Sequence, residues 1–270
     1  MISKEVRKYI QDSFKKGKVV CLTGAGISAE SGIPTFRGKG GLWEKYDPEI
    51  YANTEGLVST FRTHPDNIVD FIVDFYSLLL KAYPNPAHLA LAVLEKESIL
   101  SAIITQNIDN LHQRAGSRNV IELHGNAFRI RCMQCLKAIT LEKDRLKEMV
   151  ELLKINRTSR IKLLKVLSRY FPRCKCGSRY RIDIVLFGEM LPQDELSNAY
   201  KQLDNCEVLL LVGTSLVVYP AAGLPLYAKE RGAKLIEINS EETASSDLCD
   251  YKIIGRASEV LPEILGVLKN

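Results

Sequence analysis

Residues 19–38 read VVCLTGAGISAESGIPTFRG, and in this stretch a short apolar run leads directly into a glycine-rich segment. The run Val19–Thr23 predicts a buried β-strand. Gly24 and Gly26 carry no Cβ and can take positive φ angles, so a glycine-rich turn here is able to bring the backbone close to a pyrophosphate. Because a GxGxxA pattern by itself also fits an ordinary strand-to-helix turn, the residues around it must decide whether this is a dinucleotide site.

The residues that follow depart from the usual dinucleotide fingerprint. Gly32 and Pro34 cut short the helix that should come next, and the acidic residue expected about 20 residues further on is missing. In its place, residues 35–43 form a glycine-rich loop that holds Phe36, Arg37 and the chain's only tryptophan. A hydride-transferring dehydrogenase therefore fits poorly, since this loop occupies the place of its nicotinamide support.

The composition is that of an ordinary globular protein. The chain has 270 residues, 46% of them hydrophobic and 26% charged, which is enough for a substantial core. No apolar run approaches the roughly 20 residues that cross a bilayer, and the first residues show no secretion signal. Seven cysteines, four of them in two close pairs, argue against a secreted disulfide framework. We therefore expect a cytoplasmic protein with reduced cysteines.

Short β-branched runs alternate with helical patterns along most of the chain. Strands are predicted at 18–23, 101–105, 183–187, 207–213 and 233–238, and helices near 3–16, 86–96, 193–203, 220–230 and 258–268. This alternation is typical of βαβ units around a parallel sheet that is covered on both faces. Residues 129–182 break the alternation and predict a second, smaller module inserted in the sheet domain.

The four paired cysteines predict a metal site in that smaller module. Two short knuckles, Cys132/Cys135 and Cys174/Cys176, can supply the four soft ligands of a tetrahedral zinc ion. A set of four cysteines leaves no open coordination position, so the zinc would be structural, with a redox pair or free thiols as the alternative. The other three cysteines lie in or beside apolar runs and are expected to act as small hydrophobic side chains.

The spacer between the two knuckles, 136–173, is predicted to be largely helical. Four of its apolar side chains follow helical spacing and are expected to face a core: Ile161, Leu164, Leu167 and Phe171. Residues 151–181 hold ten Lys or Arg and one acidic residue, a net charge of +9 against +5 for the whole chain. This charge fits either a solvated helix face or a docking surface for an acidic partner or nucleic acid.

Polar side chains follow several of the predicted strands. The sequence TQNIDNLH at 105–112 follows one strand, and VGTS at 212–215 and Ile238-Asn239 end two more. The sequence ELHG at 122–125 comes just ahead of the cysteine module. Because the carboxyl ends of parallel strands meet at one edge of a sheet, we expect a ligand crevice at that edge.

These motifs together resemble the sirtuin (Sir2) family of NAD-dependent protein deacylases. The resemblance is carried by GAGISAESGIPTFRG at 24–38, TQNIDNLH at 105–112, ELHG at 122–125, FGE at 187–189, GTSLVVYPAA at 213–222 and the cysteine pairs, in the family's order. It implies an α/β fold with a Rossmann-type parallel sheet domain and an inserted small zinc-binding module. The implied NAD-binding domain comprises 1–128 and 183–270, with a cofactor loop and helical segment at about 35–85, and the zinc-binding module comprises 129–182.

By matched position, the resemblance also implies the ligand contacts. NAD, consumed as a co-substrate, would be held by Gly24, Ala25, Gly26, Ser28, Ala29, Glu30, Ile33, Pro34, Thr35, Phe36, Arg37, Trp43, Gln106, Asn107, Ile108, Asp109, Gly213, Thr214, Ser215, Asn239, Ser240, Glu241 and Ala257. An acetyl-lysine peptide would add as a strand to Val185, Phe187, Gly188, Glu189, Val217 and Val218. One structural Zn²⁺ would be bound by Cys132, Cys135, Cys174 and Cys176. The catalytic residues would be His124, Asn107 and Asp109.

The resemblance assigns individual roles within that set. His124, in the HG motif, would be the base that deprotonates a ribose hydroxyl, since histidine titrates near neutrality. Asp109 would recognise the nicotinamide carboxamide, and Phe36 would shield the reacting face. Asn239 would replace the missing acidic residue at the ribose. Of the other histidines, His88 is expected to lie at the surface.

The acyl group is expected to be neutral. Sirtuins that prefer succinyl or malonyl groups carry a Tyr and an Arg three residues apart after the cofactor loop, where this chain has Tyr76 and Leu79. Without the arginine, a buried acyl carboxylate would lack its charge partner, so we expect acetyl and other neutral groups to be preferred. Ile182 stands where the family usually has proline, and no function is assigned to it.

Two other functions would share parts of this site. A protein mono-ADP-ribosyltransferase would use the same cofactor site and the same first bond cleavage, but would transfer the ADP-ribosyl group to protein. A non-catalytic NAD-binding or chromatin-binding module would need no base, and the presence of His124, Asn107 and Asp109 together disfavours it.

Overall fold

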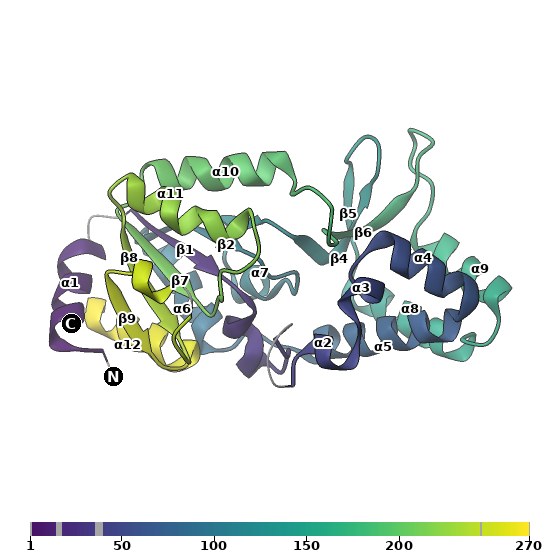
Figure 1. Ribbon diagram of the computed structural model, residues 1–270, viewed down its shortest axis with the longest axis horizontal. Helices are drawn as coiled ribbons and strands as arrows, with labels where there is room; N and C mark the ends of the chain where they lie inside the picture. The colour runs from purple at the N-terminus through teal and green to yellow at the C-terminus, as the bar shows by residue number, and fades with distance from the viewer. Residues whose placement is uncertain (1, 15–17, 36–39, 244, 270) are drawn as a thin grey trace. The chain divides into compact units, whose positions relative to one another are not determined.

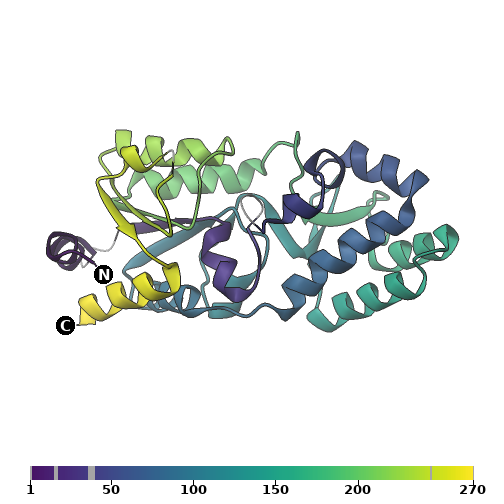
Figure 2. The same ribbon diagram turned by 60° about the horizontal axis from the view of Figure 1, so that its bottom comes forward.

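The structure, a computed structural model, describes residues 2–14, 18–35, 40–243 and 245–269. The chain divides into two compact units, each made of separate stretches of sequence (Figures 1 and 2). The first unit comprises Met1–Ile33, Tyr83–His124 and Leu191–Asn270, and the second comprises Pro34–Ala82 and Gly125–Met190. Among the described residues, no helix has the length and apolar character needed to span a membrane.

Six strands form the sheet of the first unit: β1 (Val19–Thr23), β2 (Leu100–Thr105), β3 (Val120–Glu122), β7 (Val208–Val212), β8 (Lys234–Asn239) and β9 (Tyr251–Ile254). They lie in the order β3-β2-β1-β7-β8-β9, and every neighbouring pair is parallel. Counted along the chain, this is the 3-2-1-4-5-6 order of doubly wound nucleotide-binding sheets. The predicted α/β class and Rossmann-type sheet are therefore confirmed.

The central position of β1 explains its sequence. It pairs with β2 on one side and with β7 on the other, and all five of its residues are buried. A strand covered on both faces needs apolar side chains throughout rather than an alternating pattern, as the run VVCLT provides. The order of the sheet reverses between β1 and β7, which is where ligands bind in sheets of this type.

Helices cover both faces of this sheet: α1 (Lys4–Phe14), α6 (Pro86–Lys96), α7 (Leu111–Ala115), α10 (Gln193–Asp204), α11 (Leu224–Glu230) and α12 (Ala257–Lys269). In Figure 1, α10 and α11 lie above the sheet and α6 and α12 lie below it. The start of α6 is fixed by the Asn85 side chain, which accepts from the Ala87 amide, and by Pro86 in the first turn. The predicted helix at 86–96 is confirmed at both ends.

The second unit combines helices with a small antiparallel sheet. Its helices are α2 (Leu42–Lys45), α3 (Pro48–Tyr51), α4 (Thr54–Thr63), α5 (Pro65–Lys81), α8 (Lys143–Ile155) and α9 (Arg160–Tyr170). Its sheet has the order β5-β4-β6, with β4 (Gly125–Cys132), β5 (Ala138–Thr140) and β6 (Tyr180–Ile184). The Tyr76 hydroxyl in α5 donates to the Ala127 carbonyl oxygen in β4 at 3.0 Å. The helical segment expected at 35–85 with the sheet domain thus packs with residues 125–190.

The strand predicted at 183–187 is wrong in its bounds and in its sheet. The strand is β6, Tyr180–Ile184, and it pairs with β4 in antiparallel fashion rather than joining the parallel sheet. The apolar run Val185–Phe187 continues beyond the strand, and only its last residue, Phe187, lies in a turn. A continuous apolar run does not reveal which sheet a strand joins, because that depends on partners distant in sequence.

The helical face predicted for the spacer is also wrong. α9 buries Leu163, Val166 and Tyr170, whereas Ile161 is 72% exposed and Leu164 is 51% exposed. The sequence places two leucines side by side, so two apolar stripes one residue apart share the helical period. In the folded protein, the buried stripe is the one formed by Leu163, Val166 and Tyr170.

Candidate functional site

The turn after β1 is short and tightly packed. A 3₁₀ helix over Ala25–Ser31 ends at Gly32, whose φ of 82° stops it, so the predicted interruption of the helix is confirmed. Gly24, however, is extended at φ −126°, and neither it nor Gly26 has a positive φ. The freedom of glycine to adopt a positive φ is therefore not used at these two positions, and their need for glycine has another cause.

That cause is the close approach of the turn after β7. A Cβ at Gly24 would lie 2.7 Å from the Thr214 Cβ, and one at Gly26 would lie 2.8 Å from the Gly213 carbonyl oxygen. The Gly26 amide donates to that same oxygen at 2.8 Å. Gly213 itself has φ +58°, a region that favours glycine. Two glycine turns therefore interlock where the sheet order reverses, which is where ligands bind in sheets of this type.

The polar residues after β2 join this pair of turns through buried hydrogen bonds. The Asn107 amide nitrogen donates to the Gly24 carbonyl oxygen at 3.0 Å and lies 3.1 Å from the Ser28 hydroxyl. Ser28 donates in turn to the Asp109 carboxylate at 2.7 Å. Asn107 and Asp109 are each 5% exposed and Ser28 is 1% exposed. The fold therefore brings three predicted site residues, Ser28, Asn107 and Asp109, into one buried hydrogen-bonded group.

The charge state of Asp109 is set by competing effects. Burial raises the pKa of its carboxyl, while the hydrogen bonds from the Ser28 hydroxyl and the Leu111 amide oppose that rise. The Leu111 amide donates to Oδ1 at 2.9 Å, so both carboxylate oxygens have partners. A carboxyl held in this way is rigid and suited to a directed hydrogen bond with a ligand amide.

His124 lies beside this group with one ring nitrogen already engaged. Its Nδ1 is 2.9 Å from the Gln106 carbonyl oxygen, which can only accept, so Nδ1 carries the proton and Nε2 keeps its lone pair. Burial lowers the pKa of the imidazole, although the Gln106 contact opposes that shift. His124 is therefore neutral at neutral pH and has the protonation state of a general base.

The nucleotide side of the site is tied together through Thr214. The Gln106 side-chain amide donates to the Thr214 hydroxyl at 2.8 Å, and the Asn239 side-chain amide donates to the Thr214 carbonyl oxygen at 3.1 Å. Asn239 is the last residue of β8, the strand next to β7. The ends of three strands thus meet through side chains that were predicted to contact NAD.

The remaining first-unit candidates lie around these turns. Ala25, Ala29 and Glu30 lie on the 3₁₀ helix, and Ile33 lies just after it. Ile108 and Ala257 are buried. The residues that follow the strands are exposed, apart from the half-buried Val218: Ser215, Val217, Ser240 and Glu241. Glu30 pairs with Arg256 at 3.6 Å. The exposed residues stand outside the buried hydrogen-bonded group.

A polar layer beneath the site was missed in the sequence. The Thr23 hydroxyl lies 2.8 Å from the Thr105 hydroxyl and 3.0 Å from His112 Nε2, all buried. His88 is fully buried, not at the surface as expected, and its Nδ1 lies 3.4 Å from the Asn85 amide that it caps. An Asn-Pro pair followed by His at the third helical position is a capping pattern, and it could have revealed this burial.

The candidates of the second unit lie on two segments. Pro34, Thr35 and Trp43 belong to the stretch that leads to and forms α2, while Val185, Phe187, Gly188 and Glu189 follow β6. Phe36 and Arg37 lie outside the described residues. The Trp43 and Phe187 ring centroids are 6.3 Å apart, so these two segments meet within the unit.

The four paired cysteines converge as predicted. Their Sγ atoms all lie within 4.8 Å of one another, with Cys132 to Cys176 at 3.4 Å and Cys135 to Cys174 at 3.6 Å. A tetrahedral zinc ion with Zn–S bonds of about 2.3 Å needs sulfurs about 3.8 Å apart, so the donor set and its spacing fit zinc.

The pKa values of these thiols also indicate that a bound cation is needed for all four to ionise. The Cys176 amide lowers the pKa of Cys174 to about 6. The Lys137 amide favours the thiolate of Cys135 as well, but the Cys132 and Cys174 sulfurs outweigh it and raise the pKa of Cys135 to about 11. Four clustered thiols cannot all ionise side by side unless a cation offsets their charge.

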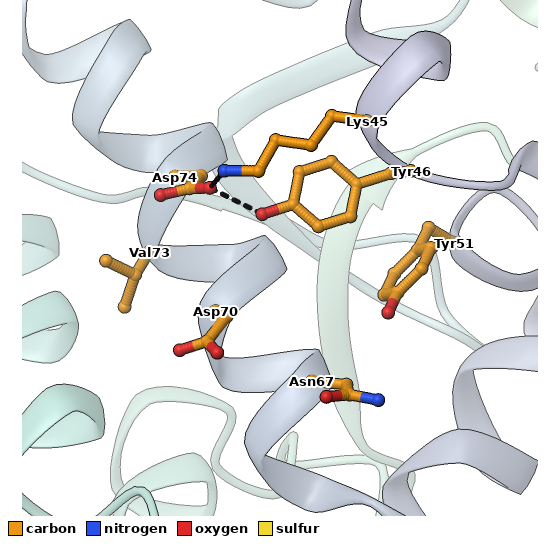
Figure 3. Close-up of a pocket in the computed structure, with 7 residues that line it drawn as sticks. All are labelled: Lys45, Tyr46, Tyr51, Asn67, Asp70, Val73 and Asp74. Carbon is orange, nitrogen blue, oxygen red and sulfur yellow. Dashed lines mark hydrogen bonds and ion pairs between the residues drawn. The ribbon is translucent and has the colours of Figure 1, made fainter.

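A separate cavity of about 350 Å³ lies among the helices of the second unit. Figure 3 shows Lys45 and Tyr46 pointing toward Asp74, whose Oδ2 accepts from both. Asp70, on the same wall, accepts from Arg157 at 2.5 Å. Burial and the Asp74 contact raise the pKa of Tyr46 to about 12, so this hydroxyl stays protonated. The charges of the cavity neutralise one another, and we assign it no chemistry.

Comparison with known proteins agrees with this geometry. The family model of the Sir2 family matches residues 24–220. The chain is 46% identical over 267 residues to an NAD-dependent protein deacylase 2 of Archaeoglobus fulgidus, which covers 98% of this chain and 96% of the relative. A Sir2 homologue solved as an NAD complex has a TM-score of 0.78 and 40% identity, covering 100% of this chain and 94% of that one. A Sir2 structure with a p53 peptide and NAD⁺ has a TM-score of 0.76 and 36% identity, covering 98% of each chain.

Proposed function

The chain belongs to the Sir2 family, and from the site described above we propose that it is an NAD-dependent protein-lysine deacylase. The reaction moves an acyl group from a lysine side chain to the ADP-ribose part of NAD and yields nicotinamide, O-acetyl-ADP-ribose and free lysine. The observation that carries this proposal is the neutral His124, whose Nε2 has no hydrogen-bond partner among the described residues, beside the buried group of Asn107, Asp109 and Ser28.

The chain's own residues supply alignment and a base. In the first step, the acyl oxygen of the modified lysine attacks the ribose C1′ and displaces nicotinamide. Because an amide oxygen is a weak nucleophile, this step depends on holding the acyl oxygen and the ribose in line in a pocket without water. Asn107 and Asp109, each nearly free of solvent, orient the nicotinamide carboxamide and exclude water. His124 Nε2 then takes the proton of a ribose hydroxyl, and the freed oxygen attacks the acyl carbon.

NAD is held as a substrate by the two interlocked turns. Gly24, Gly26 and Gly213 form the backbone of the turns that would lie against the pyrophosphate, and Thr214 and Asn239 hold the adenosine half. Phe36 and Arg37, outside the described residues, take the roles of shielding the reacting face and closing over the ribose.

Zinc has a structural role in this proposal. Bound by the four cysteines, the ion supplies the charge that lets all four thiols ionise, and it ties the end of β4 to the segment before β6. With every position taken by sulfur, no step of the reaction uses the metal.

The substrate is an acylated lysine in a protein segment. The peptide contacts assigned to the second unit are Val185, Phe187, Gly188 and Glu189, and those of the first unit are Val217 and Val218. Main-chain pairing with an added strand reads little side-chain sequence, so we expect broad acceptance of peptides.

The acyl group is neutral in this proposal. Leu79 is 2% exposed, and the Tyr76 hydroxyl is already bound to the Ala127 carbonyl oxygen. Neither side chain offers a cation to an acyl carboxylate, so a succinyl or malonyl group would be buried without a partner. Acetyl is the expected first choice, with longer neutral chains next.

A docking role for the basic segment 151–181 is a further part of the proposal. Arg157 is paired with Asp70 at 2.5 Å and Arg169 with Glu148 at 2.8 Å, so a portion of the charge is offset within the unit. Lys162 and Lys165 in α9 are exposed and available to an acidic surface, of a protein or of nucleic acid. DNA binding that does not depend on salt concentration, or that survives charge reversal at Lys165, would refute this docking role.

We also place the protein in the cytoplasm, because metal-type cysteine pairs are typical of reducing compartments.

One incubation tests the main proposal. The protein is mixed with NAD and an acetyl-lysine peptide, and the products are identified by mass. Nicotinamide, free lysine and O-acetyl-ADP-ribose in equal amounts are expected. A mass gain on protein would indicate ADP-ribosyl transfer instead, and NAD that is not consumed would leave only a binding protein.

A further inference from the structure

A tight turn carries three of the proposed peptide contacts in the second unit. We name Leu186–Glu189 the peptide turn. The Glu189 amide donates to the Leu186 carbonyl oxygen at 3.1 Å, and Gly188 supplies the φ of +83° that the third position of such a turn needs. Phe187 is exposed at the second position, and its amide donates to the Ala52 carbonyl oxygen at 2.7 Å.

Arg181, in the strand before the peptide turn, holds Glu189 at two points. Its Nη1 donates to Oε1 and its Nη2 to Oε2, both at 2.5 Å. A parallel two-point pair fixes direction as well as distance, which a single contact does not. The two side chains are 36% and 27% exposed, so water screens them less than a fully exposed pair.

The Glu189 carboxylate is engaged entirely by its own unit. Besides Arg181, it accepts from the Leu186 amide at 3.1 Å and from the Thr54 hydroxyl at 3.3 Å. Burial alone would raise its pKa, but Arg181 and the Leu186 amide hold that pKa below the ordinary value. Glu189 therefore stays ionised at neutral pH and links β6, the peptide turn and the start of α4.

We propose that Arg181 is a positioning residue for substrate binding, which acts through the Glu189 carboxylate to fix the main chain of the peptide turn. The inference rests on the proposed function, and it changes the role of Glu189 from a direct peptide contact to a link. Strand addition needs main-chain N–H and C=O groups that are already in register. A released turn must be ordered again when the peptide binds, which weakens peptide binding and leaves NAD binding unchanged.

The test compares Arg181→Ala, Glu189→Ala and the double variant, with Arg181→Lys as the conservative variant. We expect each single alanine variant to raise the peptide KM and Kd about tenfold, with kcat and the NAD KM unchanged within about twofold. The double variant should be no worse than Glu189→Ala, because Glu189→Ala already removes the Arg181 link together with the contacts to the Leu186 amide and the Thr54 hydroxyl. Arg181→Lys, which keeps the charge and loses the two-point pair, should fall between wild type and Arg181→Ala. Lys147→Ala, which breaks an exposed pair in the same unit, is the matched control and should match wild type.

Other outcomes would overturn the inference. Effects of the two single variants that multiply in the double variant would mean that Glu189 contacts the peptide directly. Hydrogen exchange at the Leu186 amide should become faster in Arg181→Ala, and unchanged exchange would exclude positioning. The peptide Kd and this exchange need no turnover, so a wild-type protein without deacylase activity would refute the proposed function separately.

Discussion

The Nδ1 atom of His124 makes the hydrogen bond to the Gln106 carbonyl oxygen, which leaves Nε2 as the atom that acts as the proposed base. Replacement by alanine removes the base and leaves the Gln106 carbonyl at a half-buried edge that water can reach. We expect His124→Ala to lower kcat/KM for deacylation by about 10²–10⁴-fold. Thermal unfolding should stay close to wild type, and NAD binding should persist. Full turnover in this variant would contradict the assignment.

The pH dependence of the reaction follows from the same residue. Burial lowers the pKa of His124 below its ordinary value of 6.5, and a base must be unprotonated to act. Activity should therefore hold through neutral pH and fall only as the pH drops below 6.5. A profile of kcat/KM against pH measures this midpoint in the free enzyme. A midpoint at or above 6.5 would contradict the role of burial.

Leu79 is the residue on which the proposed preference for neutral acyl groups rests. An acyl carboxylate near this buried side chain would lose its hydration and gain no cation. Since about 1.4 kcal/mol gives a tenfold change, we expect a succinyl peptide to react at least about tenfold more slowly than the acetyl peptide of the same sequence. Rates for the two peptides at equal concentration check this, and faster succinyl turnover would contradict it.

Among the elements, the interlocked turns after β1 and β7 have no space for added side-chain atoms. A Cβ at Gly213 would overlap the Ile27 amide nitrogen and the Gly26 carbonyl carbon, at a φ of +58°. We expect Gly213→Ala to lower the free energy of unfolding by about 1–3 kcal/mol and to weaken NAD binding. Gly232→Ala is the matched control, because its φ is also positive but no atom lies within 4 Å of its Cβ. Equal NAD affinity in both variants would contradict the role of the turns.

The small sheet of the second unit depends on its metal. Removal of zinc would leave four thiols clustered between β4 and the segment before β6. We expect a strong chelator to release about one zinc per chain and to expose the β4 and β6 amides to hydrogen exchange. Cys132→Ser should do the same, whereas Cys249→Ser, outside the cluster, should retain the metal. Zinc retained in the Cys132 variant would contradict this site.

The elements differ in how far the sequence predicts them. The helix at 86–96 could be placed because Asn85 and Pro86 mark its start locally. The face of α9 could not, because Leu163 and Leu164 are adjacent and only long-range packing chooses between them. The strand β6 was misplaced for the same reason, since its partner β4 lies far away in the sequence.

At the scale of the whole molecule, the site was more predictable than its supporting contacts. The motif residues Asn107, Asp109 and His124 stand at strand ends, and the parallel topology brings such ends to one edge. The true cause of the glycine at Gly24 depends on atoms of a distant segment, the turn after β7. No local pattern contains those distances, so only the folded structure could supply them.

The place of β1 in the sheet has a consequence for synthesis on the ribosome. Its two neighbours, β2 and β7, come later in the chain, and β7 begins only at Val208, when about three quarters of the 270 residues have been made. Until then the nascent chain carries an unpaired edge of a strand that is apolar except for Thr23, and such an edge is prone to association with other chains. The second unit, complete by Met190, has all its residues available earlier. Folding during translation therefore favours the unit with the cysteines, and the NAD-binding sheet closes last.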